Sequence, residues 1–331
     1  MAGILNPITI RDVTLRNRLV MPPMSVGLAT NEGVVTEELI KHYIQRSEAL
    51  GLVIIEHSYV TIEGKLSSNQ LGIHNDNLIQ GLKNLAQNIH KTGASTIIQI
   101  NHAGKSTNPQ ITGTQPVAPS PLNGARELKV DEINNLEKAF ASATERAVKA
   151  DFDGVELHGC HGFLLNQFFS PLTNRRNDIY GGSLENRMRF PLEVIKSVRQ
   201  KLGRKILSYR LGAVDLIPKG IKIEDSKKFA VKMEEAGVDT IHVSGGFCGA
   251  SPEPLQNTQG YFVPYAKEIK KVVKIPVIGV SGIKDIEYAD SIIKKGKADL
   301  VAIGRTLLED PNWAKNAIEK LKSQLFNRAT A

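Results

Sequence analysis

The sequence has few of the features that mark secreted, membrane or iron–sulfur proteins. Its 331 residues include two cysteines, Cys160 and Cys248, and no CxxC pair. This excludes a disulfide framework and a cysteine-held iron–sulfur cluster within the chain, and it suits a reducing cytoplasm. No apolar run approaches the length of a membrane span. The first residues, MAGILNPITIRD, lack the pattern of a signal peptide. We therefore expect a cytoplasmic protein that is not inserted in a membrane.

The composition is that of a globular protein with a basic balance. Hydrophobic residues make up 41% of the chain and charged residues 23%, with a formal net charge of +8. Lys and Arg are spread along the chain, and no stretch combines clustered basic residues with aromatic ones. We therefore expect no nucleic-acid partner. An anionic cofactor or substrate fits the positive charge.

Eight short apolar runs recur along the chain. Each is nearly continuous in its hydrophobicity, which is typical of strands buried on both faces of a parallel sheet. The runs are RLVMPP (18–23), LVIIE (52–56), STIIQI (95–100), DGVELH (153–158), KILSYRL (205–211), DTIHVS (239–244), IPVIGV (275–280) and DLVAIG (299–304).

The segments between these runs have helical periodicity. One apolar set (Leu78, Leu82, Leu85, Ile89) follows a 4-3-4 spacing, and another (Ile133, Leu136, Phe140, Ala143, Ala147) follows 3-4-3-4. Each set falls on one helical face. Several helical segments run into a glycine just before the next strand, where the left-handed conformation would end a helix compactly. These glycines are Gly51, Gly93, Gly203, Gly237 and Gly296.

The order of these elements predicts the fold. Eight strand–helix units close most naturally as a (β/α)8 TIM barrel of the α/β class, and we expect residues 1–331 to form one domain. A doubly wound open sheet is the alternative, but the turn after the first strand, MPPMSVG, is not the GxGxxG of a dinucleotide site. Two long connections, 101–130 and 159–185, follow strands and should lie at the end of the barrel where active sites are found.

Glycines also follow the last two predicted strands, in GVSG (279–282) and GR (304–305). Barrels commonly bind phosphate in these two loops, through backbone N–H groups that glycines leave exposed. Tight turns alone would also explain the glycines. Two such loops together with Arg305 favour a phosphate site.

The stretch LHGCHGF (157–163) places His158 and His161 at the end of the fourth predicted strand. The residues themselves leave four interpretations open. The histidines could be metal ligands, although further ligands would then be needed. They could support Cys160 as a nucleophile, donate hydrogen bonds to an anionic oxygen, or be structural.

The longest distinctive stretch, HGFLLNQFFSPLTNRRNDIYGGSLENRMRF (161–190), resembles the signature of the Old Yellow Enzyme family of flavin-dependent ene-reductases. NRLVMPPM (17–24), IIQINHAGK (97–105), the arginine of SYRL, VSGG (243–246) and DLVAIGR (299–305) also match it, in order. The resemblance covers essentially the whole chain and is greatest to the short branch that consists of a single barrel. It implies non-covalently bound FMN, NAD(P)H as electron donor, a small-molecule activated alkene as acceptor, and no metal.

The resemblance also implies roles for individual residues. His158 and His161 would be the catalytic pair, which binds the carbonyl or nitro oxygen of the alkene and stabilises the negative charge that develops there. Arg210 would lie by flavin N1 and O2, Gln99 at the pyrimidine edge, and the amide of His57 near O4. The other cofactor-binding residues would be Pro23, Met24, Ser25, Gly282, Gly304 and Arg305.

One departure from the family pattern bears on the chemistry. The tyrosine that commonly donates a proton to the α-carbon is replaced by Phe163, which has no proton to give. Water, Cys160, or a loop tyrosine such as Tyr59 or Tyr261 could take its place.

Three further departures bear on the pocket. Ser25 stands where relatives often have cysteine or threonine, and Gly27 where a tyrosine is frequent. His57 replaces a small residue beside the flavin and either crowds the site or adds a donor to it. The residues expected in the substrate pocket are Ser25, Gly27, Tyr59, Phe163 and Tyr261.

These observations predict an FMN-dependent enzyme that uses NAD(P)H to reduce the activated C=C bond of an enone or enoate. Because Phe163 removes the usual proton donor, a nitroreductase or NAD(P)H oxidase of the same family is an alternative. A phosphate-binding barrel lyase without redox chemistry is the alternative from another class. Arg328 could reach a neighbouring subunit, which would make the protein a homo-oligomer.

Overall fold

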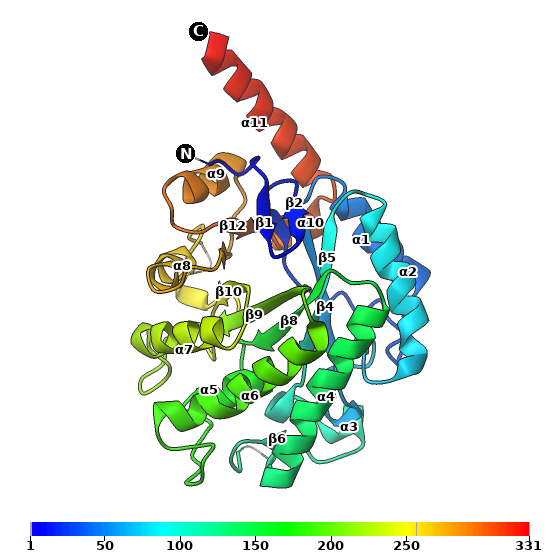
Figure 1. The fold of residues 1–331 in the computed structure, drawn as a ribbon, viewed down its shortest axis with the longest axis vertical. Helices are drawn as coiled ribbons and strands as arrows, with labels where there is room; N and C mark the ends of the chain where they lie inside the picture. Colours follow the sequence, from blue (N-terminus) through cyan, green and yellow to red (C-terminus); the bar gives the residue numbers. More distant parts are fainter. Residues whose placement is uncertain (1, 123, 256, 331) are drawn as a thin grey trace.

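The computed structural model describes residues 2–122, 124–255 and 257–330 and contains a closed barrel of eight parallel strands (Figure 1). Neighbouring strands pair in chain order, and the last strand closes on the first. All eight apolar runs form these strands, so the TIM-barrel prediction is confirmed and the open sheet is wrong. The barrel strands are β3 (Leu19–Met21), β4 (Leu52–Tyr59), β5 (Ser95–Asn101), β8 (Gly154–Gly159), β9 (Ile206–Gly212), β10 (Thr240–Ser244), β11 (Val277–Gly279) and β12 (Leu300–Ala302).

Helices follow each barrel strand and cover the sheet from outside (Figure 1). In α4 the buried face carries all five apolar residues whose spacing predicted a helix there. These faces pack on the outward side chains of the strands, which form the largest apolar cluster of the molecule. The covering helices are α1 (Glu37–Ser47), α2 (Ile79–His90), α4 (Val130–Lys149), α6 (Leu184–Leu202), α7 (Ile223–Glu235), α8 (Val263–Lys270), α9 (Ile286–Lys294) and α11 (Trp313–Thr330).

The glycines before the strands act in two different ways. Gly93, Gly203, Gly237 and Gly296 have positive φ angles of 82°, 61°, 102° and 63°, as expected for glycines that end a helix. Gly51 does not have a positive φ. A Cβ there would overlap the carbonyl oxygen of Asn17, so glycine is needed because two backbones approach closely. The predicted left-handed conformation is therefore wrong for Gly51.

An N-terminal hairpin closes one end of the barrel. Strands β1 (Ile8–Ile10) and β2 (Val13–Leu15) pair antiparallel, which the sequence reading did not predict. Ile10 and Leu15 join an apolar cluster with residues that begin several barrel strands, including Leu52 and Leu300. Because this cluster fills the N-terminal end, the opposite end remains for a site.

The two long connections contain short elements of their own. Residues 101–130 include η3 (Gly104–Ser106), α3 (Pro109–Thr112) and the two-residue strands β6 (Val117–Ala118) and β7 (Arg126–Glu127), and residues 159–185 include α5 (Leu164–Phe169). The other short helices are η1 (Ile62–Gly64), η2 (Asp76–Leu78), η4 (Glu253–Leu255) and α10 (Arg305–Glu309).

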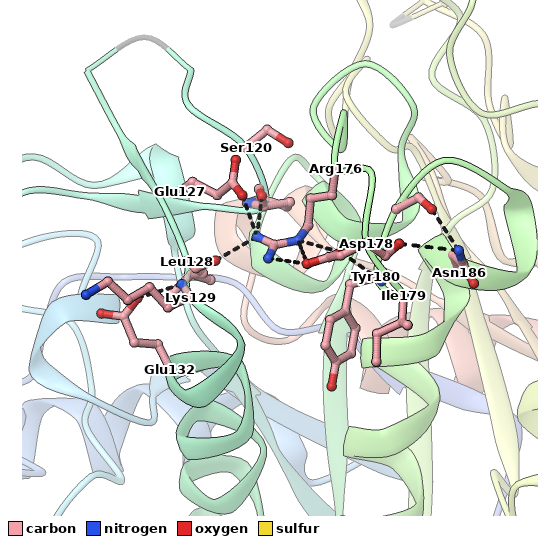
Figure 2. A network of polar contacts seen from close by, with 12 residues as sticks. Ser120, Glu127, Leu128, Lys129, Glu132, Arg176, Asp178, Ile179, Tyr180 and Asn186 are labelled. Carbon is pink, nitrogen blue, oxygen red and sulfur yellow. Dashed lines mark hydrogen bonds and ion pairs between the residues drawn. The ribbon is translucent and has the colours of Figure 1, made fainter.

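A buried arginine joins these two connections (Figure 2). Arg176 donates from Nη1 to the carbonyl oxygens of Pro119 and Leu128, at 2.8 and 2.7 Å. Its Nη2 lies 2.6 Å from a carboxylate oxygen of Asp178. Because one planar guanidinium bonds both segments, it fixes the long loops against each other at the mouth of the barrel.

The C-terminal helix α11 projects away from the barrel (Figure 1). The side chain of Arg328, which the sequence suggested for a subunit contact, lies outside the described residues. Within the described ranges, no helix combines the length and the apolar character that crossing a bilayer requires.

Candidate active site

A cavity of about 410 Å³ opens at the carboxyl ends of the barrel strands. Seven of the eight strands supply a residue of its wall, either at their last positions or just beyond them. The wall includes three cationic side chains, Arg210, Lys284 and Arg305, and no carboxylate among the described residues. The site is therefore electropositive, as an anionic cofactor would require.

The loops after β11 and β12 form one side of this cavity. Gly282, Gly304 and Arg305 all line it, and Gly282 has a φ of 57°. A Cβ at Gly304 would lie 3.2 Å from Sδ of Met24, so a side chain there would press on the residues that follow β3. Ser281 has a φ of 114° and a buried hydroxyl oxygen without a partner in the described structure. This surface of exposed backbone and unpaired polar groups, beside Arg305, fits a phosphate group.

Two buried polar side chains lie within the barrel; Arg210 lines the cavity, whereas Gln99, also expected at the cofactor, is not part of its wall. Gln99 and Arg210 lie inside the barrel, and Oε1 of Gln99 and Nε of Arg210 have no hydrogen-bond partner among the described residues. Nε2 of Gln99 donates to Glu156 at 2.8 Å, so only its oxygen remains free. Buried polar atoms without partners are rare in folded proteins. A flavin ring, which carries both donors and acceptors at its polar edge, would supply partners for them.

The two histidines of LHGCHGF come together at this cavity. His158 is the penultimate residue of β8, and His161 follows the strand with a φ of 56°. Their rings lie edge to face, with Nε2 of His158 3.4 Å from Nδ1 of His161. Nε2 of His161 lies 2.8 Å from Oγ of Ser244, while Nδ1 of His158 has no partner in the described structure. The pair is thus the end of a hydrogen-bonded chain that begins at Ser244.

Both rings are neutral in this site. Burial, with added repulsion from Arg210, holds the pKa of His158 and of His161 well below the usual range. Each neutral imidazole offers one N–H. When Ser244 donates to His161 and His161 donates to His158, the remaining N–H is at Nδ1 of His158.

Ser25 lines the cavity beside a buried carboxylate. The Ser25 hydroxyl hydrogen-bonds to Glu56, which also accepts from the backbone N–H of Val26 at 2.9 Å. Burial raises the pKa of Glu56 to about 7 in spite of these two bonds. The Ser25 hydroxyl, which the sequence assigned to cofactor binding, is therefore shared with Glu56.

Not every residue expected at the pocket reaches it. His57, Phe163 and Tyr261 line the cavity, together with Pro23 and Met24. Gly27 is exposed, has a φ of 66°, and is not part of the wall.

The hydroxyls of two tyrosines that were proposed as proton donors already donate hydrogen bonds to backbone carbonyls. Tyr59 is the last residue of β4 rather than a loop residue; it is fully buried, and its hydroxyl donates to the carbonyl of Glu32 at 3.0 Å. Tyr59 does not line the cavity, which corrects the prediction that it lies in the substrate pocket. The Tyr261 hydroxyl donates to the carbonyl of Ala250 at 2.6 Å.

The same geometry bears on two other interpretations of this stretch: metal binding by the histidines and Cys160 as a nucleophile. Ligand atoms of His158, Cys160 and His161 lie within 4.8 Å of one another. Cys160 is fully buried, and burial raises the pKa of its thiol far above neutrality. A protonated, inaccessible thiol is a poor ligand and a poor nucleophile.

Several residues of the wall were not predicted from the sequence. Ser244 was within the VSGG match and Ser281 within GVSG, but neither received a role, and Lys284 was not predicted. Gln70 hydrogen-bonds to the ring of His57 from outside the cavity. No sequence pattern indicated this residue, because the two side chains come close only in the folded chain. The position of Ser244 as the last residue of a barrel strand was the one available signal.

Comparisons with known proteins agree with this geometry. The model of the NADH:flavin oxidoreductase / NADH oxidase family matches residues 3–324. An NADH oxidase from Thermoanaerobacter brockii is 44% identical over 329 residues, which are 96% of this chain and 50% of that protein. The chain thus spans about half the length of this curated relative.

Two solved structures resemble the barrel closely. A 2-naphthoyl-CoA reductase in complex with 2-naphthoyl-CoA superposes with a TM-score of 0.92 at 27% identity, covering 96% of this chain and 52% of that one. The old yellow enzyme homologue from Zymomonas mobilis gives a TM-score of 0.85 at 28% identity, covering 96% and 93%.

The family match extends over nearly the whole chain, and the barrel carries a cavity whose residues fit FMN. Membership implies FMN as cofactor and NAD(P)H as electron donor. The chain belongs to the NADH:flavin oxidoreductase / NADH oxidase family, to which the old yellow enzymes also belong.

Proposed function

We propose that this chain is an FMN-dependent oxidoreductase that uses NAD(P)H to reduce the activated C=C bond of a small enone or enoate. The observation that carries the proposal is the neutral histidine pair, His158 and His161, at a cavity whose wall and loops fit FMN. Bound FMN would supply the hydride-transfer chemistry that none of the side chains can provide.

The residues of the chain would bind and polarise the acceptor. Nδ1 of His158, a buried atom without a partner among the described residues, would donate to the activating oxygen of the alkene. Negative charge develops on that oxygen during reduction, and a donor fixed in position stabilises it. If Ser244 donates to His161, the bonds through His161 would leave the ring proton of His158 at Nδ1. Arg210 would place positive charge against the polar edge of the cofactor.

The proton that completes the reduction would come from solvent. Phe163 cannot donate, the Tyr261 hydroxyl is bonded to a backbone carbonyl, and Cys160 is buried with a raised pKa. The cavity is open, so water can reach it. We therefore expect slower alkene reduction than a site with a tyrosine at position 163 would support.

The same missing proton donor supports a second candidate, NAD(P)H oxidation with oxygen or a nitro compound as acceptor. Neither acceptor needs a proton delivered to an α-carbon. The name of the Thermoanaerobacter brockii relative, NADH oxidase, also favours this activity. The non-redox lyase loses its support, because its only basis was a phosphate site that FMN would occupy.

Anaerobic reduction of the FMN-loaded protein by NADH or NADPH, followed by a cyclic enone, would test the proposal. Return of the oxidised flavin spectrum with formation of the saturated ketone is the expected result. Reduction by nicotinamide, followed by reoxidation with oxygen or a nitro compound but not with enones or enoates, would replace the first proposal by the second. Protein that cannot be loaded with FMN would refute both.

A further inference from the structure

A buried carboxylate lies inside the barrel, one row of side chains below the cavity. Residues that pair across neighbouring parallel strands point to the same face of the sheet. His158, Arg210 and His242 pair in this way and form one row on the inner face. Glu156 comes two residues before His158 on β8, so it points to the same face one row deeper, and it is fully buried.

Three hydrogen-bond donors surround the carboxylate of Glu156. Its Oε1 accepts from Nε2 of Gln99 at 2.8 Å, and its Oε2 accepts from the hydroxyl of Ser208 at 2.8 Å. Oε2 also lies 3.1 Å from Nδ1 of His242. An ionised carboxylate can only accept hydrogen bonds, so three donors around it stabilise the charged form.

His242 does not neutralise this anion. Because the carboxylate accepts, Nδ1 of His242 carries the ring proton. Nε2 of His242 is buried and has no partner in the described structure, so a second proton there would create an unpaired charge in the interior. Burial lowers the pKa of His242; the attraction of Glu156 opposes this shift without outweighing it, and repulsion from Arg210 adds to it. The two side chains together therefore carry one negative charge.

Arg210 places the opposite charge nearer the cavity. It lines the cavity wall, whereas Glu156 does not. Its guanidinium is not among the groups that hydrogen-bond to Glu156. Charges inside a protein are screened less than charges at its surface, so the two side chains still act on each other. The positive charge that faces the cavity is thus partly offset by a negative charge behind it.

We propose that the buried charge of Glu156 lowers the reduction potential of bound FMN and so makes the reduced cofactor a stronger hydride donor. A hydride carries two electrons and one proton, so its transfer from NAD(P)H adds one negative charge to the cofactor. Arg210 stabilises that charge, and Glu156 opposes it. Gln99 connects the two regions, since its Nε2 binds Glu156 and its Oε1 has no partner in the described structure. The inference rests on the proposed function only for the acceptor of the hydride.

The test is the equilibrium between the FMN-loaded protein and a redox dye of known potential, measured without oxygen after unbound FMN has been removed. Glu156→Gln removes the charge and keeps the size of the side chain. The equilibrium constant for two-electron reduction of the bound cofactor should rise about tenfold, which is a positive shift of about 30 mV. Glu156→Met also removes the charge and should shift the constant in the same direction, which covers the case in which Glu156→Gln does not fold or retain FMN.

Two control variants separate charge from other effects. Ser208→Ala removes one hydrogen bond to Glu156 and leaves its charge, so the equilibrium constant should change less than about twofold. Glu145→Gln removes a carboxylate that pairs with Lys201 at the surface, and it should leave the constant unchanged because solvent screens that charge.

An equilibrium constant that is unchanged or lower in the Glu156 variants that bind FMN overturns the inference. A shift in Ser208→Ala as large as that in Glu156→Gln also overturns it, because the orientation of the side chains rather than the charge would then set the potential. No alkene takes part in this measurement. A wild-type protein that reduces no enone or enoate would therefore refute the proposed function, while the dye equilibrium would still report on Glu156.

Discussion

The side-chain nitrogen of Gln99 lies 2.8 Å from a carboxylate oxygen of Glu156, inside the barrel and below the cavity. Both side chains are fully buried. Glu156 also accepts from Ser208 at 2.8 Å and lies 3.1 Å from Nδ1 of His242. Burial opposes its ionisation, but His242, Arg210 and Ser208 outweigh burial and lower its pKa. A buried anion thus fixes the orientation of the Gln99 amide.

Replacing Glu156 by glutamine should weaken FMN binding. A glutamine offers one acceptor oxygen where the carboxylate offers two, so at least one of the three donors loses its partner and Gln99 is free to turn. We expect the dissociation constant for FMN to rise about tenfold and the free energy of unfolding to fall by about 2 kcal/mol. Titration of the apoprotein with FMN and urea unfolding measure the two effects.

Glu145→Gln is the matched control for this change. Glu145 lies on α4 at the surface and pairs with Lys201 in a solvent-exposed ion pair, which contributes little stability. Unchanged FMN affinity in Glu156→Gln would show that the free oxygen of Gln99 does not depend on Glu156 for its orientation.

Phe163→Tyr should accelerate the reduction of enones. The Phe163 ring lines the cavity 4.5 Å from the His158 ring, so a hydroxyl added to it would stand at the cavity wall. General acid catalysis typically contributes about 10²–10⁴-fold, and we expect at least about a tenfold faster reoxidation by an enone. Stopped-flow measurement of the two half-reactions would show it. The rate of reduction by NADH should not change; a similar increase in both half-reactions would contradict the assigned role.

Glu56 should make the stability of the fold depend on pH. Its pKa is about 7 in the folded protein and near the model-compound value of 4.5 when unfolded. The folded state therefore keeps this proton at pH values where the unfolded chain has released it. Its stabilising effect is fully present below about pH 4.5, decreases as the pH rises towards 7, and is absent above that value, a total change of about 3 kcal/mol.

The difference between wild type and Glu56→Gln isolates this effect. Glutamine does not titrate, so the variant should gain stability relative to wild type as the pH rises from 5 to 8. Urea unfolding at several pH values measures the difference. A constant difference over this range would show that Glu56 is ionised throughout, and Glu145→Gln again serves as the surface control.

Local patterns in the sequence were enough to determine the barrel. Strands buried on both faces need continuous apolar runs, and covering helices need one apolar face, so both leave a signal within a few residues. The N-terminal hairpin gave no such signal, because Ile10 and Leu15 contact their apolar partners only when the first residues of the barrel strands come together in the fold. Gly51 was assigned the wrong backbone conformation for the same reason, since its neighbour Asn17 is distant in the chain.

The site was determined only in part by the sequence. The motifs indicated His158, His161, Arg210 and the glycines, which lie at strand ends and so meet at one mouth in any barrel of this topology. The tertiary structure alone decided that Tyr59 points away from the cavity and that Gln70 reaches His57. Such contacts depend on which side chains the folded backbone brings within hydrogen-bond distance. The spacing of residues along the chain does not indicate their distance in space.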